Sequence, residues 1–370
     1  MSKRLHIISF DNPYPPNYGG VIDVFYKLKS LKQAGVKITL HIFEYGRVAA
    51  AELENYCEEV IYYKRRTFVN PFIGTLPYIV STRNDHQLLK NLLKDDAPIL
   101  FEGLHTCHFL NHPDLKNRKK MVRMHNIEHD YYRKLEEVES NFFKKYFFSK
   151  EAERLQQYES ILHYANIIWA ISPNDFNTLK SRYKHVQLLP AFHANEQISS
   201  KTGIGKFAFY HGNLSVGEND EAARFLVNKV FNDLDVPLII AGNNPSEALK
   251  NAVANYAHIS LQQNISTEQI NTLTAEAQLN VLPTFQGTGI KLKLLNVLFQ
   301  GRWVIANQTM VENTGLESLC RIANFPEEFK QAVSELMKQQ FNDIQKENRS
   351  QVLNREFSNA ENIKKLIQAI

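Results

Sequence analysis

Cysteine is scarce in this sequence, and its few copies are scattered. The 370 residues contain three cysteines, Cys57, Cys107 and Cys320, at spacings that match neither a disulfide framework nor a metal-ligand cluster. Long apolar runs are also missing, since none approaches the roughly 20 residues that span a bilayer. The amino-terminal MSKRLHIISF enters a strand without the pattern of a signal peptide. We therefore expect a cytoplasmic protein.

A strong excess of one charge is absent as well. The net charge is +4, and residues 1–190 carry 27 Lys and Arg against 21 Asp and Glu, whereas residues 191–370 carry 16 against 18. This excess is too small to indicate nucleic-acid binding, and no nucleic-acid motif accompanies it. A mildly basic first half suits an acidic acceptor or the inner, anionic face of a membrane.

The length and the pattern together predict two α/β domains. A chain of 370 residues is too long for one comfortable core. Apolar runs of strand length alternate with amphipathic helical runs in both halves, which is typical of parallel sheets covered by helices. The weakly patterned residues 191–206 interrupt this alternation. We therefore predict a first domain over 1–195, a second over 196–355 and a terminal helix over 356–370.

The most informative stretch is residues 279–307. A short apolar strand is followed by the loop Gln286, Gly287, Thr288 and Gly289, and then by an amphipathic helix and a second strand. Glycines let backbone N–H groups approach a ligand, and a helix N-terminus favours an anion. Two lysines, Lys291 and Lys293, stand in the predicted first turn, where the helix dipole disfavours cations. A bound diphosphate would compensate them.

Four further strand ends carry candidate residues. The first strand is followed by the loop DNPYPPNYGG, which places Gly19 and Gly20 before the first helix. Two later strands end in polar clusters, with Glu102 and His105 after one, and His125 and Glu128 after the next. In the second half, the strand at 207–210 leads to Gly212 and Asn213. Ligands of open α/β sheets bind at such carboxyl ends, so these residues are candidates for binding. The full set of candidate residues is Gly19, Gly20, Glu102, His105, His125, Glu128, Gly212, Asn213, Gln286, Gly287, Thr288, Gly289, Lys291, Lys293 and Asn296.

These stretches resemble one protein family. GTGIKLKLLNVLFQGRWVIAN is similar to the donor-site motif of GT-B-fold glycosyltransferases of the retaining family-four group, in which a glycine loop precedes an IKLLEAL-like helix and a GxPVV strand. The loop PPNYGG, the segment HNIE and the segment GNLS with its following helix also resemble that family. The resemblance implies two Rossmann-like domains that face a central cleft, with the terminal helix crossing back to the first domain.

The resemblance also implies an activity. A UDP- or GDP-sugar would bind, and its sugar would pass to a glycan or lipid-linked acceptor, with retention of configuration, in polysaccharide assembly. We assign catalysis to Lys293, Lys291, His125 and His105. Acceptor binding falls to Glu102 and Glu128, and the remaining candidates bind the donor. No metal and no cofactor is expected, because lysines and backbone N–H groups carry the leaving-group charge.

Two departures from the family pattern bear on activity. The family has two glutamates with seven residues between them across the donor motif, and Thr288 and Asn296 stand at those places here. It also often has an arginine where Asn213 stands, so a phosphate partner is missing. An alternative function is therefore a catalytically impaired binding or scaffold protein. A nicotinamide-dependent enzyme is a third alternative, against which the absence of the GxGxxG pattern counts.

The segment Asn141–Lys150, NFFKKYFFSK, has two interpretations. Aromatic and basic residues interleave in it, which suits a peripheral contact with a membrane. A helix that packs its aromatic residues in the core and exposes its lysines has the same composition. The sequence favours the second interpretation, because helices at this point commonly cover the sheet.

Overall fold

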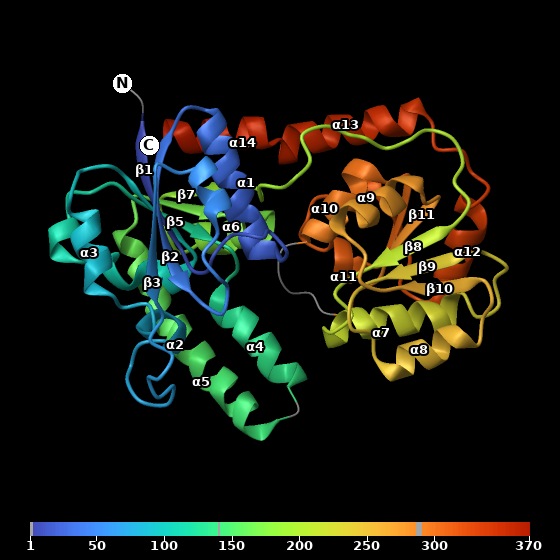
Figure 1. Ribbon diagram of the computed structural model, residues 1–370, viewed down its shortest axis with the longest axis horizontal. Helices are drawn as coiled ribbons and strands as arrows, with labels where there is room; N and C mark the ends of the chain where they lie inside the picture. The colour runs from blue at the N-terminus through green and yellow to red at the C-terminus, as the bar shows by residue number, and fades with distance from the viewer. Residues whose placement is uncertain (1–2, 140, 286–290) are drawn as a thin grey trace. The chain divides into compact units, whose positions relative to one another are not determined.

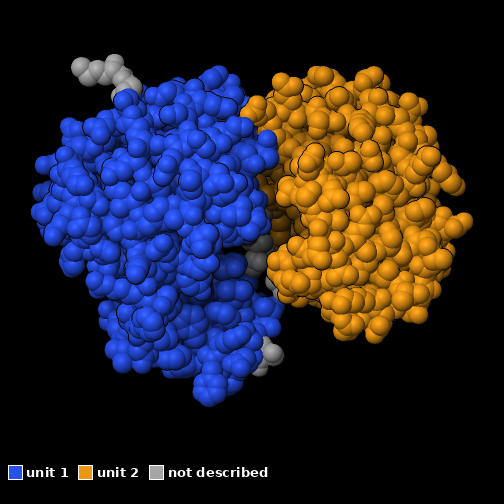
Figure 2. All heavy atoms as spheres, viewed as in Figure 1, with its two compact units in different colours: residues 1–194, 288–290, 357–370 blue, residues 195–287, 291–356 orange. Residues whose placement is uncertain are grey.

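The computed structural model describes residues 3–139, 141–285 and 291–370. It divides into two compact units, which Figure 2 shows in different colours. Of the described residues, those up to Ala194 and Phe357–Ile370 form unit 1, and the residues from Asn195 to Glu356 form unit 2.

Unit 1 is built on a parallel sheet, which has seven strands in the described part of the chain. The strand order is β3-β2-β1-β4-β5-β6-β7. The strands are β1 (Arg4–Ser9), β2 (Lys37–Glu44), β3 (Glu59–Lys64), β4 (Ile99–Glu102), β5 (Lys120–Met124), β6 (Ile167–Ala170) and β7 (Val186–Leu188). Side chains of successive residues point to opposite faces, so Ile7 and Ile8 of β1 belong to different apolar clusters. Both faces of this sheet are therefore buried.

Helices cover both faces of the unit 1 sheet (Figure 1). They are α1 (Gly19–Gln33), η1 (Ala51–Asn55), α2 (Tyr78–Ser81), α3 (His86–Leu92), η2 (Leu104–Phe109), η3 (Pro113–Leu115), α4 (Glu128–Val138), α5 (Phe142–Tyr158), η4 (Glu159–Tyr164), α6 (Pro173–Lys180) and α14 (Asn359–Gln368). The last helix, α14, lies beside α1 and buries Ile363 and Leu366 in the cluster that contains Leu5 and Leu28. The C-terminal segment thus completes the core of unit 1.

Unit 2 repeats the design with a parallel sheet of order β10-β9-β8-β11-β12-β13 in its described part. The strands are β8 (Ala208–His211), β9 (Leu238–Ala241), β10 (Ile259–Gln262), β11 (Leu279–Leu282), β12 (Trp303–Ala306) and β13 (Arg321–Ile322). The helices are α7 (Gly217–Phe225), the π-helical turn η5 (Leu226–Val230), α8 (Glu247–Ala254), α9 (Thr267–Glu276), α10 (Leu292–Gln300), α11 (Gln308–Val311), η6 (Glu317–Leu319), α12 (Pro326–Leu336) and α13 (Asp343–Phe357).

The predicted α/β class with two parallel sheets is confirmed. Local details differ. The pattern of residues 130–164 predicts one long helical stretch, but it is broken, because Asn141 caps a new helix by accepting a hydrogen bond from the N–H of Lys144. The pattern of residues 49–56 predicts a helix, and the structure has the 3₁₀ turn η1 there. Helix α13 was not predicted, because its charged sequence has no apolar stripe. The sequence also predicts Ser172 as an N-cap, and this is confirmed, since its side chain accepts from the N–H of Asp175.

Among the described residues, no helix has both the length and the apolar character needed to cross a bilayer.

Candidate functional site

The strand order of each sheet reverses at one place. In unit 1 the chain runs outward from β1 to β3 and then returns to β4 on the other side of β1. In unit 2 the same reversal separates β8 from β11. Ligands of open parallel sheets bind at the carboxyl ends of the strands beside such a reversal. The fold therefore indicates one candidate site in each unit.

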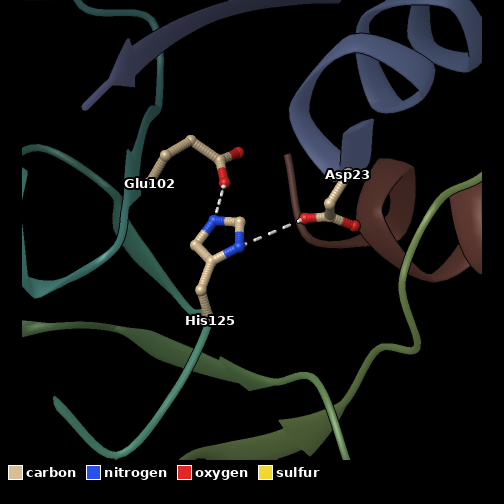
Figure 3. A group of neighbouring side chains, drawn as sticks. All are labelled: Asp23, Glu102 and His125. Atoms are coloured by element: carbon tan, nitrogen blue, oxygen red, sulfur yellow. Dashed lines mark hydrogen bonds and ion pairs between the residues drawn. The ribbon is translucent and has the colours of Figure 1, made fainter. Parts of the chain in front are cut away.

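A buried network of charged side chains lies beside the reversal in unit 1. We call Asp23, Lys27, Glu102, Arg123 and His125 the ion-pair network. Asp23 and Lys27 come from α1, Glu102 ends β4, Arg123 lies on β5, and His125 follows β5. All five side chains are almost fully buried. Figure 3 shows the ring of His125 between the carboxylates of Glu102 and Asp23.

The network is closely paired. The Lys27 ammonium lies 2.7 Å from Oε1 of Glu102 and 3.0 Å from Oδ2 of Asp23. Arg123 donates to both carboxylate oxygens of Asp23, at 3.0 and 3.2 Å. His125 shares a hydrogen bond between Nε2 and Oε2 of Glu102 at 2.9 Å, and its Nδ1 lies 3.9 Å from Asp23. Two cations thus face two carboxylates, and the charges balance.

The pKa values of the two carboxylates follow from this pairing. Burial alone would raise the pKa of Asp23, but the Arg123 guanidinium and the Lys27 ammonium hold it well below its usual range. Burial acts on Glu102 in the same direction, and Lys27, followed by the hydrogen bond with His125, lowers its pKa below the usual value. Both groups stay ionised at neutral pH.

Three members of the network also have the composition of a metal site. Asp23, Glu102 and His125 each offer a ligand atom, and these atoms lie within 4.8 Å of one another. The ammonium of Lys27, however, already contacts both carboxylates. A divalent ion there would have to displace that ammonium or accept its repulsion. The geometry therefore fits an internal salt bridge better than a metal site.

Three buried polar atoms beside the network have no hydrogen-bond partner within the described part of the chain. They are Nδ1 of His105, Nδ1 of His125 and Oε1 of Glu128. The Nδ1 atom of His105 is 3.8 Å from Oε1 of Glu128, which is longer than a hydrogen bond. The ring of Phe10 lies against both histidines, at centroid distances of 5.4 and 5.3 Å. The structure thus brings two predicted histidines against one aromatic ring and places Glu128 beside one of them.

Burial favours the uncharged forms of both Glu128 and His105. Burial raises the pKa of Glu128 to about 8, and the nearby Arg83 guanidinium only partly opposes this shift. Burial, followed by Arg83, keeps the pKa of His105 well below its usual value. Arg83 itself donates to the carbonyl oxygens of Phe10 and Ile79. Neutral hydrogen-bonding groups of this kind suit the hydroxyl groups of a sugar.

The other candidates in unit 1 have different surroundings. Gly19 begins α1, and Gly20 follows in its first turn. A Cβ atom on Gly20 would lie 2.7 Å from the ring of Phe10, so glycine lets the helix approach the ring that contacts both histidines. Glu102, assigned above to the acceptor, is fully buried and each of its oxygens has a partner.

In unit 2, Lys293 is the centre of a second cluster. It stands in the first turn of α10, and its ammonium donates to Oδ1 of Asn219 at 3.0 Å. The same ammonium lies 4.9 Å from the ring centroid of Tyr210 on β8. Among the described residues, no carboxylate is within 4.0 Å of it. We call Lys293, Asn219 and Tyr210 the Lys293 cluster.

The pKa of Lys293 is lower than that of an ordinary lysine. Burial lowers the pKa of Lys293 to about 8, Glu218 opposes the shift, and Lys291 adds to it. The carboxylate of Glu218 accepts a hydrogen bond from the hydroxyl of Thr284. Burial, together with Lys293, lowers the pKa of His211 to about 3. An anion at this place would relieve the unfavourable charge on Lys293.

Gly212 lies directly beside Lys293. A Cβ atom on Gly212 would be 3.0 Å from Nζ of Lys293 and 2.9 Å from Oδ1 of Asn219. A Cβ atom on Gly242, after β9, would be 1.9 Å from the carbonyl oxygen of Gly212. Glycine is therefore required at 242 by close backbone approach. Asn213 uses its side-chain oxygen to accept from Ser215, so it closes a local turn.

The remaining candidates in unit 2 separate into two groups. Gln286, Gly287, Thr288 and Gly289 lie outside the described residues. Lys291 is the N-cap residue of α10. Asn296, one turn after Lys293, accepts hydrogen bonds from Asn195 and Gln300, both at 3.0 Å. Its amide oxygen is thus used within unit 2.

Sequence reasoning missed the residues that hold these candidates in place. Arg349 of α13 is buried and donates to the carbonyl oxygens of Leu298, Gly301 and Arg302, so it fixes the C-terminal end of α10. The network residues Asp23, Lys27 and Arg123 were missed as well. A signal existed for Arg123, because a charged residue inside an apolar parallel strand indicates a buried ion pair.

Comparison with known proteins identifies the fold. No protein-family model matches the sequence. A Klebsiella pneumoniae protein described as an uncharacterized 44.6 kDa protein in the cps region is 26% identical over 333 residues, which cover 84% of each chain.

Several solved structures resemble the chain over its whole length. The HepE protein of Anabaena in complex with UDP and glucose has a TM-score of 0.65 and 9% identity, with all of both chains covered. An α,α-trehalose-phosphate synthase (UDP-forming) of Burkholderia xenovorans has a TM-score of 0.62 and 10% identity, with 99% of each chain covered. MurG of Acinetobacter baumannii has a TM-score of 0.55 and 14% identity, again over all of both chains. These structures are GT-B glycosyltransferases, and the present chain has the GT-B fold.

Proposed function

We propose that the protein is a glycosyltransferase that takes a sugar from a nucleotide-diphosphate sugar and transfers it to a glycan or lipid-linked acceptor, with retention of configuration. The observation that carries this proposal is the Lys293 ammonium. It is partly buried at the strand-order reversal of unit 2, and its described partners are an amide oxygen and an aromatic ring. A diphosphate is the complementary ligand for this place.

Donor binding would use the start of α10. Helix N-termini hold phosphates through backbone N–H groups, and Lys293 stands in the first turn. The absence of a side chain at Gly212 lets the ammonium of Lys293 lie close to the backbone at the end of β8. As the sugar leaves, charge grows on the diphosphate, and Lys293 with Lys291 would stabilise it. Four solved neighbours in GT-B form, including the HepE complex, carry UDP or a UDP-sugar. We therefore favour a UDP-sugar over a GDP-sugar.

The acceptor side would use unit 1. His105, His125 and Glu128 present hydrogen-bonding atoms that lack a partner among the described residues. We propose that these atoms bind sugar hydroxyl groups and that His105 or His125 takes part in proton transfer. Glu102 would act by fixing the orientation of the His125 ring through the hydrogen bond between the Glu102 carboxylate and Nε2 of His125 (Figure 3). The cps-region relative supports a role in polysaccharide biosynthesis.

One observation favours the alternative of a binding protein without catalysis. Asn296 stands where the resembled family has a glutamate, and its amide oxygen accepts from Asn195 and Gln300. A neutral side chain in that arrangement can hold the helix in place without acting on a donor. This alternative keeps the donor site and loses the transfer step.

Calorimetric titration of the full chain with UDP, GDP and their common sugar derivatives tests the proposal. We expect UDP to bind, and Lys293→Ala to weaken it at least tenfold, about 1.4 kcal/mol, without lowering the melting temperature. Lys250→Ala removes an exposed lysine of the same unit and should change nothing. No binding of any nucleotide would overturn the proposal. Binding without hydrolysis or transfer, whatever acceptor is supplied, would favour the non-catalytic alternative.

A further inference from the structure

Large apolar side chains are exposed on two segments of unit 1. The loop 65–77 exposes Phe68 completely and Ile73 to 73%. At the start of α5, Phe142 and Phe143 are exposed to 75% and 77%. A group of exposed apolar side chains of this size often marks an interaction site, because contact between apolar surface and water is unfavourable. We call the following residues the aromatic patch: Phe68, Val69, Phe72, Ile73, Leu76, Val138, Phe142, Phe143 and Tyr146.

The two segments of the aromatic patch are joined by specific contacts. The ring of Phe72 stacks on that of Tyr146 at a centroid distance of 5.8 Å. Arg154 of α5 donates to the carbonyl oxygens of Pro71 and Phe72. At the end of the loop, the Glu151 carboxylate accepts from the N–H groups of Tyr78 and Ile79, at 2.8 and 2.9 Å. The loop is therefore attached to α5 at several points.

Basic residues accompany the aromatic patch. Phe142, Tyr146 and Lys150 are spaced four residues apart, so they follow one face of α5. Lys144 lies in the first turn, which contains no acidic residue, and Arg65 and Arg66 are the first residues of the loop. The acidic residues Glu136, Glu137 and Glu153 line a hollow of about 420 Å³ between α4 and α5, and Glu153 also pairs with the Lys150 ammonium at 2.9 Å. The basic residues that accompany the exposed rings are thus Lys144, Arg65, Arg66 and the partly neutralised Lys150.

The combination of exposed rings and basic residues helps to decide between two possible partners for the aromatic patch, a second copy of the chain and a bilayer surface. In a symmetric dimer the aromatic patch would meet its own copy, which would bring a second set of basic residues to the same interface. A bilayer surface with anionic phospholipids instead offers an apolar layer to the rings and negative charge to the lysines. Aromatic residues flanked by lysine and arginine are typical of protein segments at the membrane interface. Charge complementarity therefore favours the bilayer.

We propose that the aromatic patch docks unit 1 on an anionic membrane surface, with the rings of Phe142, Phe143 and Phe68 inserted below the headgroups and Lys144 and Lys150 against the phosphates. The Phe/Lys segment is then an interface element, whereas the sequence favoured core packing for its aromatic residues. This inference does not depend on the transfer reaction. It places the binding surface on the unit that we assign to the acceptor.

Vesicle sedimentation with the full chain tests the inference. We expect binding to vesicles of phosphatidylcholine with about 30% phosphatidylglycerol, which present an anionic surface, and much weaker binding to phosphatidylcholine alone. The double variant Phe142→Ser/Phe143→Ser should reduce the bound fraction at least fivefold at an unchanged melting temperature, because both rings are exposed. Lys144→Gln/Lys150→Gln should abolish the preference for the anionic vesicles.

Two controls make the result specific. Phe325→Ser removes a phenylalanine of unit 2 that is exposed to 67%, and it should leave vesicle binding unchanged. Lys293→Ala should also bind vesicles as the unaltered chain does, so a failure of the proposed function and a failure of this inference can be told apart. Equal sedimentation of the unaltered chain and the double phenylalanine variant would overturn the inference. So would a concentration-dependent dimer that is lost in that variant while neither protein binds vesicles.

Discussion

The ion-pair network of unit 1 and the Lys293 cluster of unit 2 occupy equivalent places but differ in charge balance. Both lie at the carboxyl ends of parallel strands beside the strand-order reversal. In the network, Lys27 and Arg123 contact the carboxylates of Asp23 and Glu102. In the cluster, the ammonium of Lys293 contacts an amide oxygen and a ring. The first arrangement is complete within the protein, whereas the second leaves a cation for an external anion.

This difference in charge balance shows how the partners of a buried charged group indicate whether the group is structural or binds a ligand. Burying an ion is costly, and pairing repays the cost only when the partners fit. The lowered pKa values of Asp23 and Glu102 show that their partners more than offset burial. The lowered pKa of Lys293 shows the opposite, because burial outweighs the attraction of Glu218. We infer that the network fixes the position of His125 and that the cluster binds the ligand.

The largest expected effect comes from breaking the network. Asp23→Ala leaves Arg123 and Lys27 with one carboxylate between them, so we expect unit 1 to lose about 3–5 kcal/mol of unfolding free energy. Trp169 is buried in unit 1, and a Trp303→Phe background makes its fluorescence report unit 1 alone in a urea titration. The matched control is Glu58→Ala, which removes an exposed carboxylate of unit 1 paired with Lys37 and should cost about 0–1 kcal/mol. Equal losses in the two variants would contradict a structural role for the network.

The next largest effect concerns Glu128, a buried carboxylate of unit 1 whose pKa is raised, whereas the pKa values of Asp23 and Glu102 are lowered. Glu128 is buried next to the network, and its pKa is raised from 4.5 to about 8. The stability that its protonated form contributes is complete below pH 4.5 and is lost as the pH rises through about 8. Between pH 6 and pH 9 the unaltered chain should therefore lose about 2–3 kcal/mol that Glu128→Gln retains, at 1.36 kcal/mol per pKa unit. Denaturation curves at these two pH values measure the difference. Parallel losses in both proteins would show that Glu128 is ionised in the folded state.

The sequence predicted the fold well, because the fold depends on patterns that are local. Apolar runs separated by helical stripes specify buried parallel strands. They predict strands over Ile259–Gln262 and Trp303–Ala306, and these are the bounds of β10 and β12. Helix α13 was not predicted because it is held mainly by single contacts such as the hydrogen bonds of Arg349. The periodicity of apolar residues does not reveal such contacts. Breaks such as the one at Asn141 depend on one capping hydrogen bond.

The sites were less predictable, because they depend on contacts between distant residues. The sequence indicated His105, His125 and Lys293 from their positions at strand and helix ends. It could not show that Asp23 meets Arg123, one hundred residues later, or that Lys293 meets Asn219. The aromatic patch illustrates the same limit. The composition of Asn141–Lys150 suits either a core helix or a surface helix, and only its exposure distinguishes the two.

The smallest expected effect sharpens the comparison at Lys293 itself. In the free protein the pKa of Lys293 is about 8, so its positive charge is lost as the pH rises through that value. A bound diphosphate would favour the charged form, and UDP affinity should therefore fall about fivefold, or about 1 kcal/mol, between pH 8 and pH 9. Calorimetric titration at both pH values measures this change. Lys293→Arg keeps a permanent charge at the same place, so the affinity of this variant should stay constant over the same interval. If the two proteins lost affinity in parallel, the ammonium of Lys293 would not be the group that contacts the diphosphate. In that case, the presence or absence of a carboxylate partner would not distinguish the structural charges of the ion-pair network from ligand-binding charges.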